Sequence, residues 1–250
     1  MPINNKFLKV GTDKIFKVGS NIAGYQEFFP TDFTDNIVWL NNDPTTMTMS
    51  GANRVSEWRD SSGNSNHFIQ ATGGNQPLYV ANAINGQNGI QWENGTNQWL
   101  ARIFTITYAQ PLEFFIVWNL DSNSTATFPY LFDRSVSGDR FFLYWNSNNI
   151  RVGSSTLVTA YGSKTRPFNL MATQITFNNT ATKVYENGTL KGTFTTGTSV
   201  LSTLRLGHLG STDATTRLSG YICEVIIYSR ELTTTERTKV NNYLKVKYAL

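Results

Sequence analysis

Short apolar runs alternate with turn segments along most of the chain. From Asp35 onward the runs are rich in β-branched and aromatic residues, and the segments between them are rich in Gly, Asn, Ser and Asp. This spacing is typical of an antiparallel β-sandwich. The predicted strands are residues 36–40, 54–59, 89–92, 99–103, 112–120, 130–133, 140–145, 169–177, 182–186, 190–195, 204–209 and 220–229. We therefore expect an all-β domain over residues 31–250.

An Asn-Gly pair marks one hairpin. Asn187 and Gly188 stand between the strand-like runs 182–185 and 190–194. Both residues tolerate the positive φ that a tight turn between two strands requires. We expect these two runs to pair across the turn.

A single helical pattern is found near the C-terminus. Thr233 and Glu236 have the spacing of a capping box, in which each side chain satisfies a backbone donor of the first turn. The apolar stripe that follows at helical spacing comprises Val240, Tyr243, Leu244 and Lys247 or Tyr248. We expect a short C-terminal α-helix that lies against the sandwich.

Residues 1–30 follow a different pattern, which we interpret as an N-terminal β-hairpin arm. The run 7–11 is nearly repeated at 15–19, which predicts two short strands joined by a turn. An isolated hairpin is marginally stable in water. This one therefore either forms an edge of the sandwich or attaches the domain to a partner by strand addition. The apolar residues available for attachment are Phe7, Leu8, Val10, Ile15, Phe16 and Val18.

The composition supports a folded domain and excludes several classes of protein. Hydrophobic residues make up 40% of the chain and charged residues 15%, so the chain can bury a core. The formal net charge of +4 is small and the basic residues are dispersed, which argues against a nucleic-acid partner. Cys223 is the only cysteine and stands in an apolar run, so we expect a buried thiol and no intrachain disulfide.

The sequence does not predict a membrane partner. Residues 1–6 lack the apolar segment of a signal peptide, and no apolar run approaches the length of a transmembrane helix. We expect a soluble protein made in a cytoplasm. Such a protein would reach the outside by an unusual export route or by release of an assembled particle.

Three stretches resemble the laminin-G-like jelly-roll family within the concanavalin A-like lectin superfamily. The first runs from Val55 to His67 and on through Gln76-Pro77 to the Gly-x-x-Gly-Ile segment at 86–90. The second combines the hairpin at 184–188 with the Leu-x-Leu-Gly strand at 204–207, and the third runs from 218 to 233 and into 243–248. The resemblance covers roughly residues 35–250 and implies a jelly-roll domain.

This superfamily includes glycoside hydrolases and polysaccharide lyases, so a catalytic carboxylate pair is the first chemistry to test. A retaining glycosidase needs two carboxyl groups about 5 Å apart, and the sequence has no Glu-x-Asp-x-x-Glu cluster or close variant. Glu224 is the only carboxylate that we place inside a strong strand, with Ile222 and Ile226 on its face, and we expect it to form an internal salt bridge or hydrogen bond. His67 and His208 lack a metal-ligand spacing. We expect no catalytic residue and no enzymatic activity.

One loop carries oxygen groups that suit a metal ion. Asp60, Asn64 and Asn66 lie close together in sequence, and the resemblance implies that such groups hold calcium in some members of the family. Only Asp60 is charged. The alternative is a turn in which its carboxylate accepts hydrogen bonds from the backbone amides of residues 62–64. We favour the turn and expect no cofactor.

Two predicted strands are apolar on both faces. In residues 114–118 and 141–145 both alternating sets of side chains are apolar, whereas a strand with one wet face alternates with polar residues. The second face is covered by the terminal helix, the arm, a neighbouring subunit or a sugar ring. A sugar would stack on Tyr144 or Trp145, and the polar groups in nearby loops are Asp133, Arg134, Asp139 and Arg140.

Together these features predict a non-catalytic, lectin-like domain for binding or display. A jelly roll with a short arm is similar to structural proteins of bacteriophage particles, namely head fibres, capsid decoration proteins and tail adhesins. We expect a virion protein made in the host cytoplasm. Its arm would contact other virion subunits or a second copy of the chain, and its domain would bind host-surface or environmental glycans. The alternatives are a purely architectural virion protein and a polysaccharide-degrading enzyme.

Overall fold

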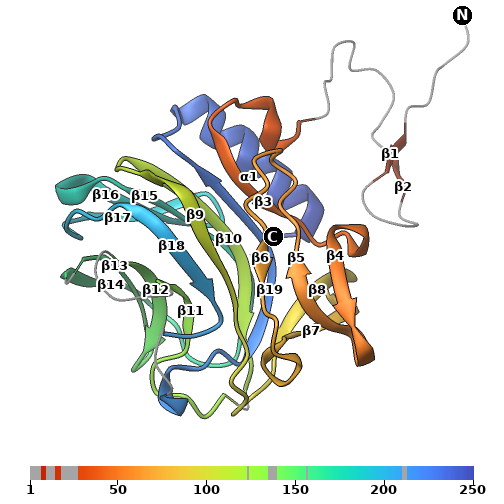
Figure 1. The fold of residues 1–250 in the computed structure, drawn as a ribbon. Helices are drawn as coiled ribbons and strands as arrows, with labels where there is room; N and C mark the ends of the chain where they lie inside the picture. The colour runs from red at the N-terminus through yellow and green to blue at the C-terminus, as the bar shows by residue number, and fades with distance from the viewer. Residues whose placement is uncertain are drawn as a thin grey trace, which may run out of the picture.

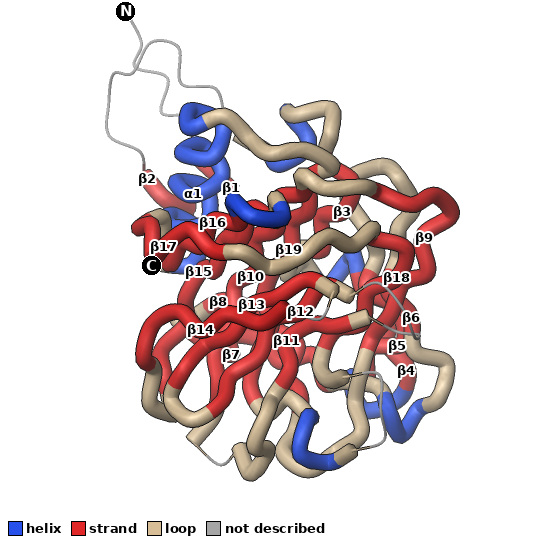
Figure 2. The backbone as a smooth tube through the Cα atoms, turned by 90° about the vertical axis from the view of Figure 1, so that its left-hand side faces the viewer, coloured by secondary structure: helices blue, strands red, loops and turns tan. Residues whose placement is uncertain are grey.

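The computed structural model describes residues 7–9, 15–17, 28–122, 124–134, 140–155, 157–209 and 213–250. Strands make up most of this part of the chain (Figure 2), and they form two layers that pack face to face (Figure 1). The predicted all-β sandwich with a C-terminal helix is confirmed. No helix in the described ranges is long and apolar enough to span a membrane.

The first layer, sheet I, is centred on strand β10. Its strands are β17 (Thr189–Phe194), β16 (Thr182–Glu186), β15 (Phe168–Phe177), β10 (Leu112–Leu120), β19 (Gly220–Tyr228), β3 (Asn36–Leu40), β8 (Gln87–Trp92) and β7 (Leu78–Ile84). All pairings are antiparallel, and β10 lies between β15 and β19. β3 and β8 pair with opposite halves of β19, and β7 pairs with β8.

The second layer, sheet II, faces sheet I across the core. Its strands, in spatial order, are β14 (Leu157–Ser163), β13 (Asn149–Ser154), β12 (Phe141–Asn146), β11 (Tyr130–Asp133), β18 (Leu201–Leu206), β9 (Leu100–Tyr108), β6 (Phe68–Ile69), β5 (Arg54–Trp58) and β4 (Met47–Ser50). A single pairing, Arg54 with Leu78, links β5 to β7 and so joins the two layers at one edge.

Short 3-10 helices occupy several of the connections. They are η1 (Pro30–Asp32), η2 (Pro44–Thr46), η3 (Gly51–Asn53), η4 (Gly73–Asn75), η5 (Asn179–Ala181) and η6 (Ala214–Thr216). In η2 and η6 an aspartate at the N-cap accepts a hydrogen bond from the backbone two residues later, which is the usual role of Asp at such turns.

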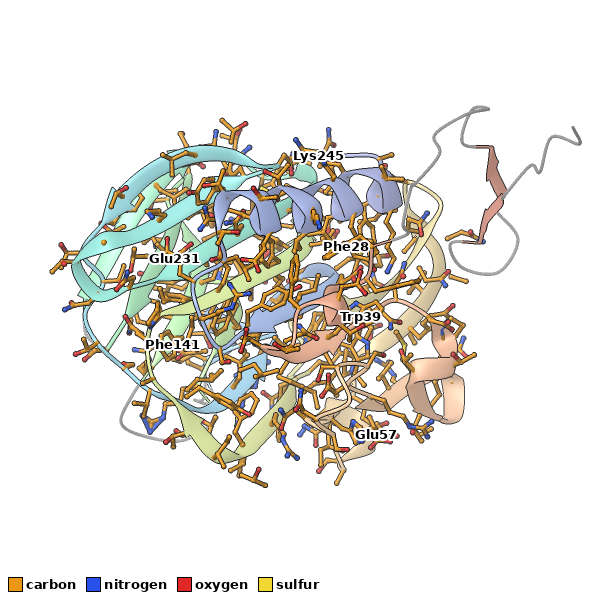
Figure 3. All side chains as sticks on the ribbon, turned by 90° about the horizontal axis from the view of Figure 1, so that it is seen from above. Phe28, Trp39, Glu57, Phe141, Glu231 and Lys245 are labelled. Atoms are coloured by element: carbon orange, nitrogen blue, oxygen red, sulfur yellow. The ribbon has the colours of Figure 1, made fainter. Side chains whose placement is uncertain are left out.

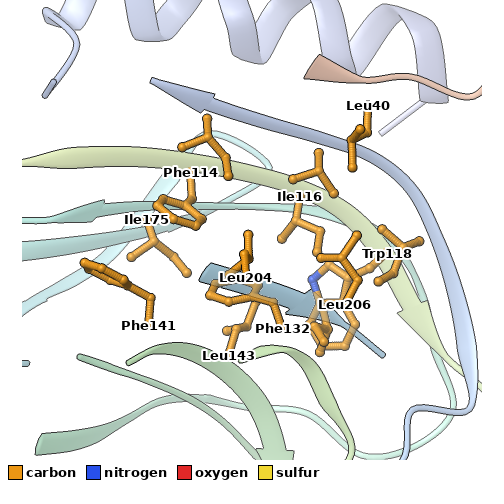
Figure 4. Close-up of a cluster of buried hydrophobic side chains, with 14 of the residues drawn as sticks. Leu40, Phe114, Ile116, Trp118, Phe132, Phe141, Leu143, Ile175, Leu204 and Leu206 are labelled. Carbon is orange, nitrogen blue, oxygen red and sulfur yellow. The ribbon is translucent and has the colours of Figure 1, made fainter. Parts of the chain in front are cut away.

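The main core lies between the two layers (Figure 4). From β10 it receives Phe114, Ile116 and Trp118, which are at most 1% exposed and face side chains of sheet II. Phe132 of β11 stacks on Phe114 with ring centroids 5.4 Å apart. Trp58 of β5 is fully buried in the same core and donates its Nε1 hydrogen to a backbone carbonyl, so the Trp of the family-like opening stretch has a structural role.

The helix α1 (Thr234–Tyr248) lies across the outer face of sheet I (Figure 3). Its predicted capping box is present, with Thr233 and Glu236 each bonded to a backbone amide of the other. Its buried apolar side chains are Val240, Leu244 and Tyr248. They pack on Phe115 and Val117 of β10. The second apolar face of β10 is therefore covered by the terminal helix, which was one of the alternatives left open.

The Asn-Gly hairpin is also confirmed. β16 and β17 pair with Glu186 opposite Thr189. The two turn residues, Asn187 and Gly188, have φ values of +47° and +79°, the left-handed values that this turn requires.

Five strands were missed by the sequence patterns: β4, β6, β7, β13 and β14. β4, β7 and β14 lie at the edges of the sheets, where the apolar alternation is weak. β6, which has only two residues, and β13, in which Ile150 and Val152 alternate with Asn149 and Arg151, lie inside sheet II. In β7, for example, no residue is fully buried. A strand of this kind is stabilised by its pairing with a neighbour and not by a burial pattern of its own.

In the N-terminal segment, β1 (Phe7–Lys9) and β2 (Ile15–Lys17) pair antiparallel as a separate two-stranded sheet, with Leu8 opposite Phe16. The predicted pairing is therefore present, while Val10 and Val18 lie outside the described residues.

Residues 28–30 belong to the range that we expected to form the arm, but they pack against the domain. Phe28 packs against Phe33 and Tyr243, with ring centroids 5.2 and 6.2 Å away (Figure 3). The carbonyl of Pro30 accepts a hydrogen bond from the Tyr228 hydroxyl. Residues 28–30 thus contact the sandwich, which places the start of the domain at Phe28 or before it.

Candidate functional site

Sheet II carries a cluster of aromatic rings and guanidinium groups on its outer face, which we call the outer-face patch. Its residues are Phe128, Tyr130, Asp133, Arg140, Phe142, Tyr144 and Arg151. They meet because alternate residues of a strand point to the same face and because β11, β12 and β13 are neighbours. The other alternating set of β12 lies in the main core.

A pair of stacked tyrosines forms the centre of the patch. Tyr130 and Tyr144 are opposite each other in register, and their rings stack with centroids 4.5 Å apart and an interplanar angle of 18°. Phe128, which is 38% exposed, lies 6.3 Å from Tyr144. Burial raises the pKa of both tyrosines, so each phenol remains a neutral hydrogen-bond donor at physiological pH.

Charged groups flank the tyrosine pair. Asp133 is buried, and Arg140 donates to both of its carboxylate oxygens while lying over the Phe142 ring at 4.7 Å. Burial raises the pKa of Asp133, and the bonds from Arg140 oppose this rise. Arg151 lies opposite Tyr144 and forms no ion pair with any described residue. The patch therefore contains one neutralised guanidinium and one that has no carboxylate partner among the described residues.

The structure brings together only part of the predicted ligand site. Tyr144, Asp133 and Arg140 do meet, and the Arg134 amide donates to Asp133 at 2.7 Å. Trp145 does not belong to the patch: it lies in the main core, 6% exposed, and its Nε1 donates to a backbone carbonyl. The reason is the alternation of side chains along β12.

Asp139 lies outside the described residues. Tyr130 and Arg151 were missed by the sequence analysis. Both residues lie opposite Tyr144 in the strand register, and this register can be known only when the partner strands of β12 are known.

Glu224 is 1% exposed and forms the predicted internal salt bridge, with Lys247 of α1. Its carboxylate accepts four bonds of 2.7 Å, from Trp39 Nε1, Tyr243 OH, Lys247 Nζ and Tyr248 OH. The expected face was wrong in one respect. A register shift opposite residues 117–118 of β10 turns Ile222 into the main core, while Ile226 stays on the face of Glu224 under α1.

A second strand carboxylate, Glu113 of β10, was missed. It is 0% exposed and accepts hydrogen bonds from Arg237 Nε at 3.0 Å and from the backbone amide of Leu232 at 2.9 Å. Glu113 and Glu224 thus both lie beneath α1, and each is paired with a cation of that helix. The prediction that Glu224 is the only carboxylate inside a strong strand was therefore wrong, because Glu113 lies in β10.

The loop with the candidate calcium ligands is a hydrogen-bonded turn. The Asp60 carboxylate accepts from the backbone amides of Trp39, Ser62 and Asn66 at 2.8–2.9 Å. Asn64 and Asn66 donate their side-chain amides to backbone carbonyls of residues 36 and 37. The three residues therefore tie the loop to β3. The described residues contain no cluster of three or more His, Cys, Asp and Glu that could hold a metal ion.

The remaining reactive side chains are also held within the fold. His67 accepts a hydrogen bond from the Asp60 amide at its Nδ1. Cys223 is 0% exposed in the cluster beneath α1, and burial raises the pKa of its thiol to about 12. The expectation of a buried thiol is confirmed.

Comparison with known families identifies the class of the domain. A laminin-G-type model, described as the concanavalin A-like lectin/glucanases superfamily, matches residues 104–236, slightly more than half of the chain. The chain belongs to this superfamily. A search of curated protein sequences gave no match.

Solved structures show the same fold at low sequence identity. The binding domain of Paraclostridial Mosquitocidal Protein 1 is 13% identical, with a TM-score of 0.60 over 86% of this chain and 53% of that one. Trypanosoma rangeli sialidase is 14% identical, with a TM-score of 0.56 over 82% of this chain, which spans only 32% of the sialidase. Domain 4 of AbnA, a GH43 extracellular arabinanase from Geobacillus stearothermophilus solved with arabinotriose, is 18% identical, with a TM-score of 0.51 over 83% of this chain and 97% of that domain.

Proposed function

We propose that this domain is a non-catalytic, lectin-like module that binds a glycan at the outer-face patch. The observation that carries the proposal is the ring of Phe128, which is 38% exposed and lies beside the stacked and buried pair Tyr130–Tyr144, with Arg140 and Arg151 at the flanks. Aromatic rings pack on the C–H faces of sugars, and a few fixed polar groups give orientation. The arabinotriose bound to a domain of the same fold supports a carbohydrate ligand.

A glycan array probed with the labelled protein tests this proposal. We expect retention of at least one glycan, and a loss of about tenfold or more in affinity for Phe128→Ala and for Arg151→Gln, because each removes a contact of about 1.4 kcal/mol or more. Phe29→Ala is the matched control, since Phe29 is 41% exposed and lies beside Trp39 on another surface. An array without any binding, or two patch variants that bind like the wild type, would overturn the proposal.

The non-catalytic part of the proposal is supported by the state of the buried carboxylates. Glu113 and Glu224 are each bonded to a cation of α1 and are covered by that helix. A general acid or nucleophile has to reach its substrate. Incubation with plant, algal and bacterial polysaccharides should release no oligosaccharide. Turnover that disappears in Glu224→Gln would refute a purely binding role.

We further propose that the module is displayed on a bacteriophage particle, as a head fibre, capsid decoration protein or tail adhesin. The support is the jelly-roll fold together with the separate pair of strands β1 and β2, which could add to a neighbour's sheet edge. Isolation of native particles followed by identification of their proteins tests this role. A particle protein that retains no glycan on the array would favour the purely architectural alternative.

A further inference from the structure

A recess opens beside the start of β15, between the end of β14 and the turn that joins β16 to β17. It has a volume of about 400 Å³ and is lined by residues 163–165 and 167–171, and by the turn residue Asn187. We infer that this recess is a second binding site, which takes one sugar ring with neighbouring hydroxyl groups. The volume lies within the range of ligand pockets and suits a single ring better than a longer chain.

Phe168, Leu170 and Met171 form the floor of the recess, which is fixed in position and exposes little apolar surface. Phe168 packs edge-to-face on Trp118 of the main core, with ring centroids 4.9 Å apart. Leu170 and Met171 are buried beneath it, one toward α1 and the other toward the main core. A floor held from both sides keeps its shape when a ligand enters, which lowers the entropy cost of binding.

Asn187 provides a preorganised donor at the wall. Its side-chain Oδ1 accepts the Ala172 amide hydrogen at 2.8 Å, and its own backbone amide donates to the Ala172 carbonyl at 2.8 Å. The side-chain amide is therefore held in one orientation. Its Nδ2 group makes no hydrogen bond with the described residues, so both of its hydrogens are available to the oxygen atoms of a ligand.

Lys164 is held in a similar way. Its backbone amide donates to Asn148 and its carbonyl accepts from Trp145, both at 2.7 Å. Its Nζ lies 3.4 Å from the carboxylate of Glu186, which is 6% exposed. An ammonium group has three donors, so Lys164 retains hydrogens for a ligand, while Glu186 also pairs with Lys191, whose Nζ lies 3.2 Å from the same carboxylate oxygen.

The chemistry of the lining selects the class of ligand. Side-chain hydroxyls of Ser163 and Thr165 and the amide of Asn169 are exposed at the rim, and each of them both donates and accepts. A surface that exposes mainly donors and acceptors, with the half-buried ring of Phe168 among them, matches a small ring with adjacent hydroxyl groups.

Titration of the isotope-labelled full chain with D-glucose, D-galactose, L-arabinose or N-acetyl-D-glucosamine tests the inference by NMR. We expect at least one of these sugars to shift the side-chain amide signals of Asn169 and Asn187 in a saturable way, with Kd in the millimolar range. Asn169→Ala should weaken binding about tenfold without changing the melting temperature. Asn242→Ala is the matched control, because Asn242 is exposed on α1.

The variant Arg151→Gln separates this site from the outer-face patch. Sugar shifts that survive Arg151→Gln and weaken in Asn169→Ala support a site in the recess, whatever the glycan array shows for the patch. If shifts weaken in Arg151→Gln and survive in Asn169→Ala, the recess is not the site and the inference fails while the proposed function stands. If no sugar shifts Asn169 or Asn187 up to about 50 mM, the inference also fails.

Discussion

Replacement of Lys247 by methionine tests the ion pair that fastens α1 to sheet I. The side chains of Lys247 and Glu224 are 9% and 1% exposed, and their charged groups are 2.7 Å apart. Methionine retains most of the apolar stem of lysine but leaves the Glu224 carboxylate buried without its cation. Removal of one partner of a buried pair costs about 3–5 kcal/mol, because the remaining hydroxyl and indole donors compensate the charge only in part.

For a domain of this size, that loss corresponds to a fall in Tm of roughly 6–20 °C. Equilibrium unfolding in guanidinium chloride measures the free energy directly. Lys239→Met, an exposed position on the same helix, is the control and should change stability by less than about 0.5 kcal/mol. The double variant Glu224→Gln with Lys247→Met should recover about 1–3 kcal/mol relative to the sum of the single changes. A Lys247→Met variant within about 1 kcal/mol of the wild type would refute the reasoning.

Three other predictions concern the folded domain. Trp58→Ala should lower the free energy of unfolding by about 3–5 kcal/mol, because it truncates a core side chain, and Asp60→Ala should lower it by about 1–3 kcal/mol, because it leaves backbone amides unsatisfied. If calcium raised the Tm strongly and Asp60→Ala removed that rise, the loop would be a metal site instead. Burial lowers the pKa of His208 to about 4 from 6.5. As the pH falls, the imidazole is therefore protonated in the unfolded chain before it is protonated in the folded one, and the free energy of unfolding should fall by up to about 3 kcal/mol between pH 6.5 and 4. His208→Gln should flatten this part of the pH profile, and a profile unchanged in that variant would contradict the role of His208. Deletion of residues 1–27 should leave a folded domain with nearly the same Tm but abolish assembly onto a partner or into an oligomer, as measured by light scattering; a truncated chain that precipitates would place the segment in the core.

Predictions that depend on neighbours in sequence agreed with the structure. The capping box at Thr233 and Glu236 and the Asn187-Gly188 turn are settled by contacts within a few residues, as are the strongly apolar strands such as β10 and β19. Their signals are local, because a helix turn or a tight hairpin is closed by backbone bonds between residues close in the chain. The strands β7 and β13 lack a strong apolar run of their own, and each is stabilised by pairing with the strand next to it in sequence, β8 and β12.

The candidate sites could not be predicted from local patterns either, because their residues come from segments that are far apart in the sequence. Periodicity showed that β10 and β12 are apolar on both faces, but it did not show what lies over each face. Glu113 meets Arg237 across 124 positions of sequence, and Asn187 and Lys164 meet at the recess because two separate turns come together.

The sequence by itself determined the class of the fold, its most apolar strands, one hairpin and the helix that ends the chain. Tertiary structure alone decided that α1 covers β10, that Trp145 and Tyr144 of β12 face opposite layers, and that the buried carboxylates are paired with the helix. The physical reason is that the side-chain period of a strand fixes which residues share a face. The partner of that face is chosen by packing and by pairing between distant segments, whose closure cost depends only weakly on their separation in the chain.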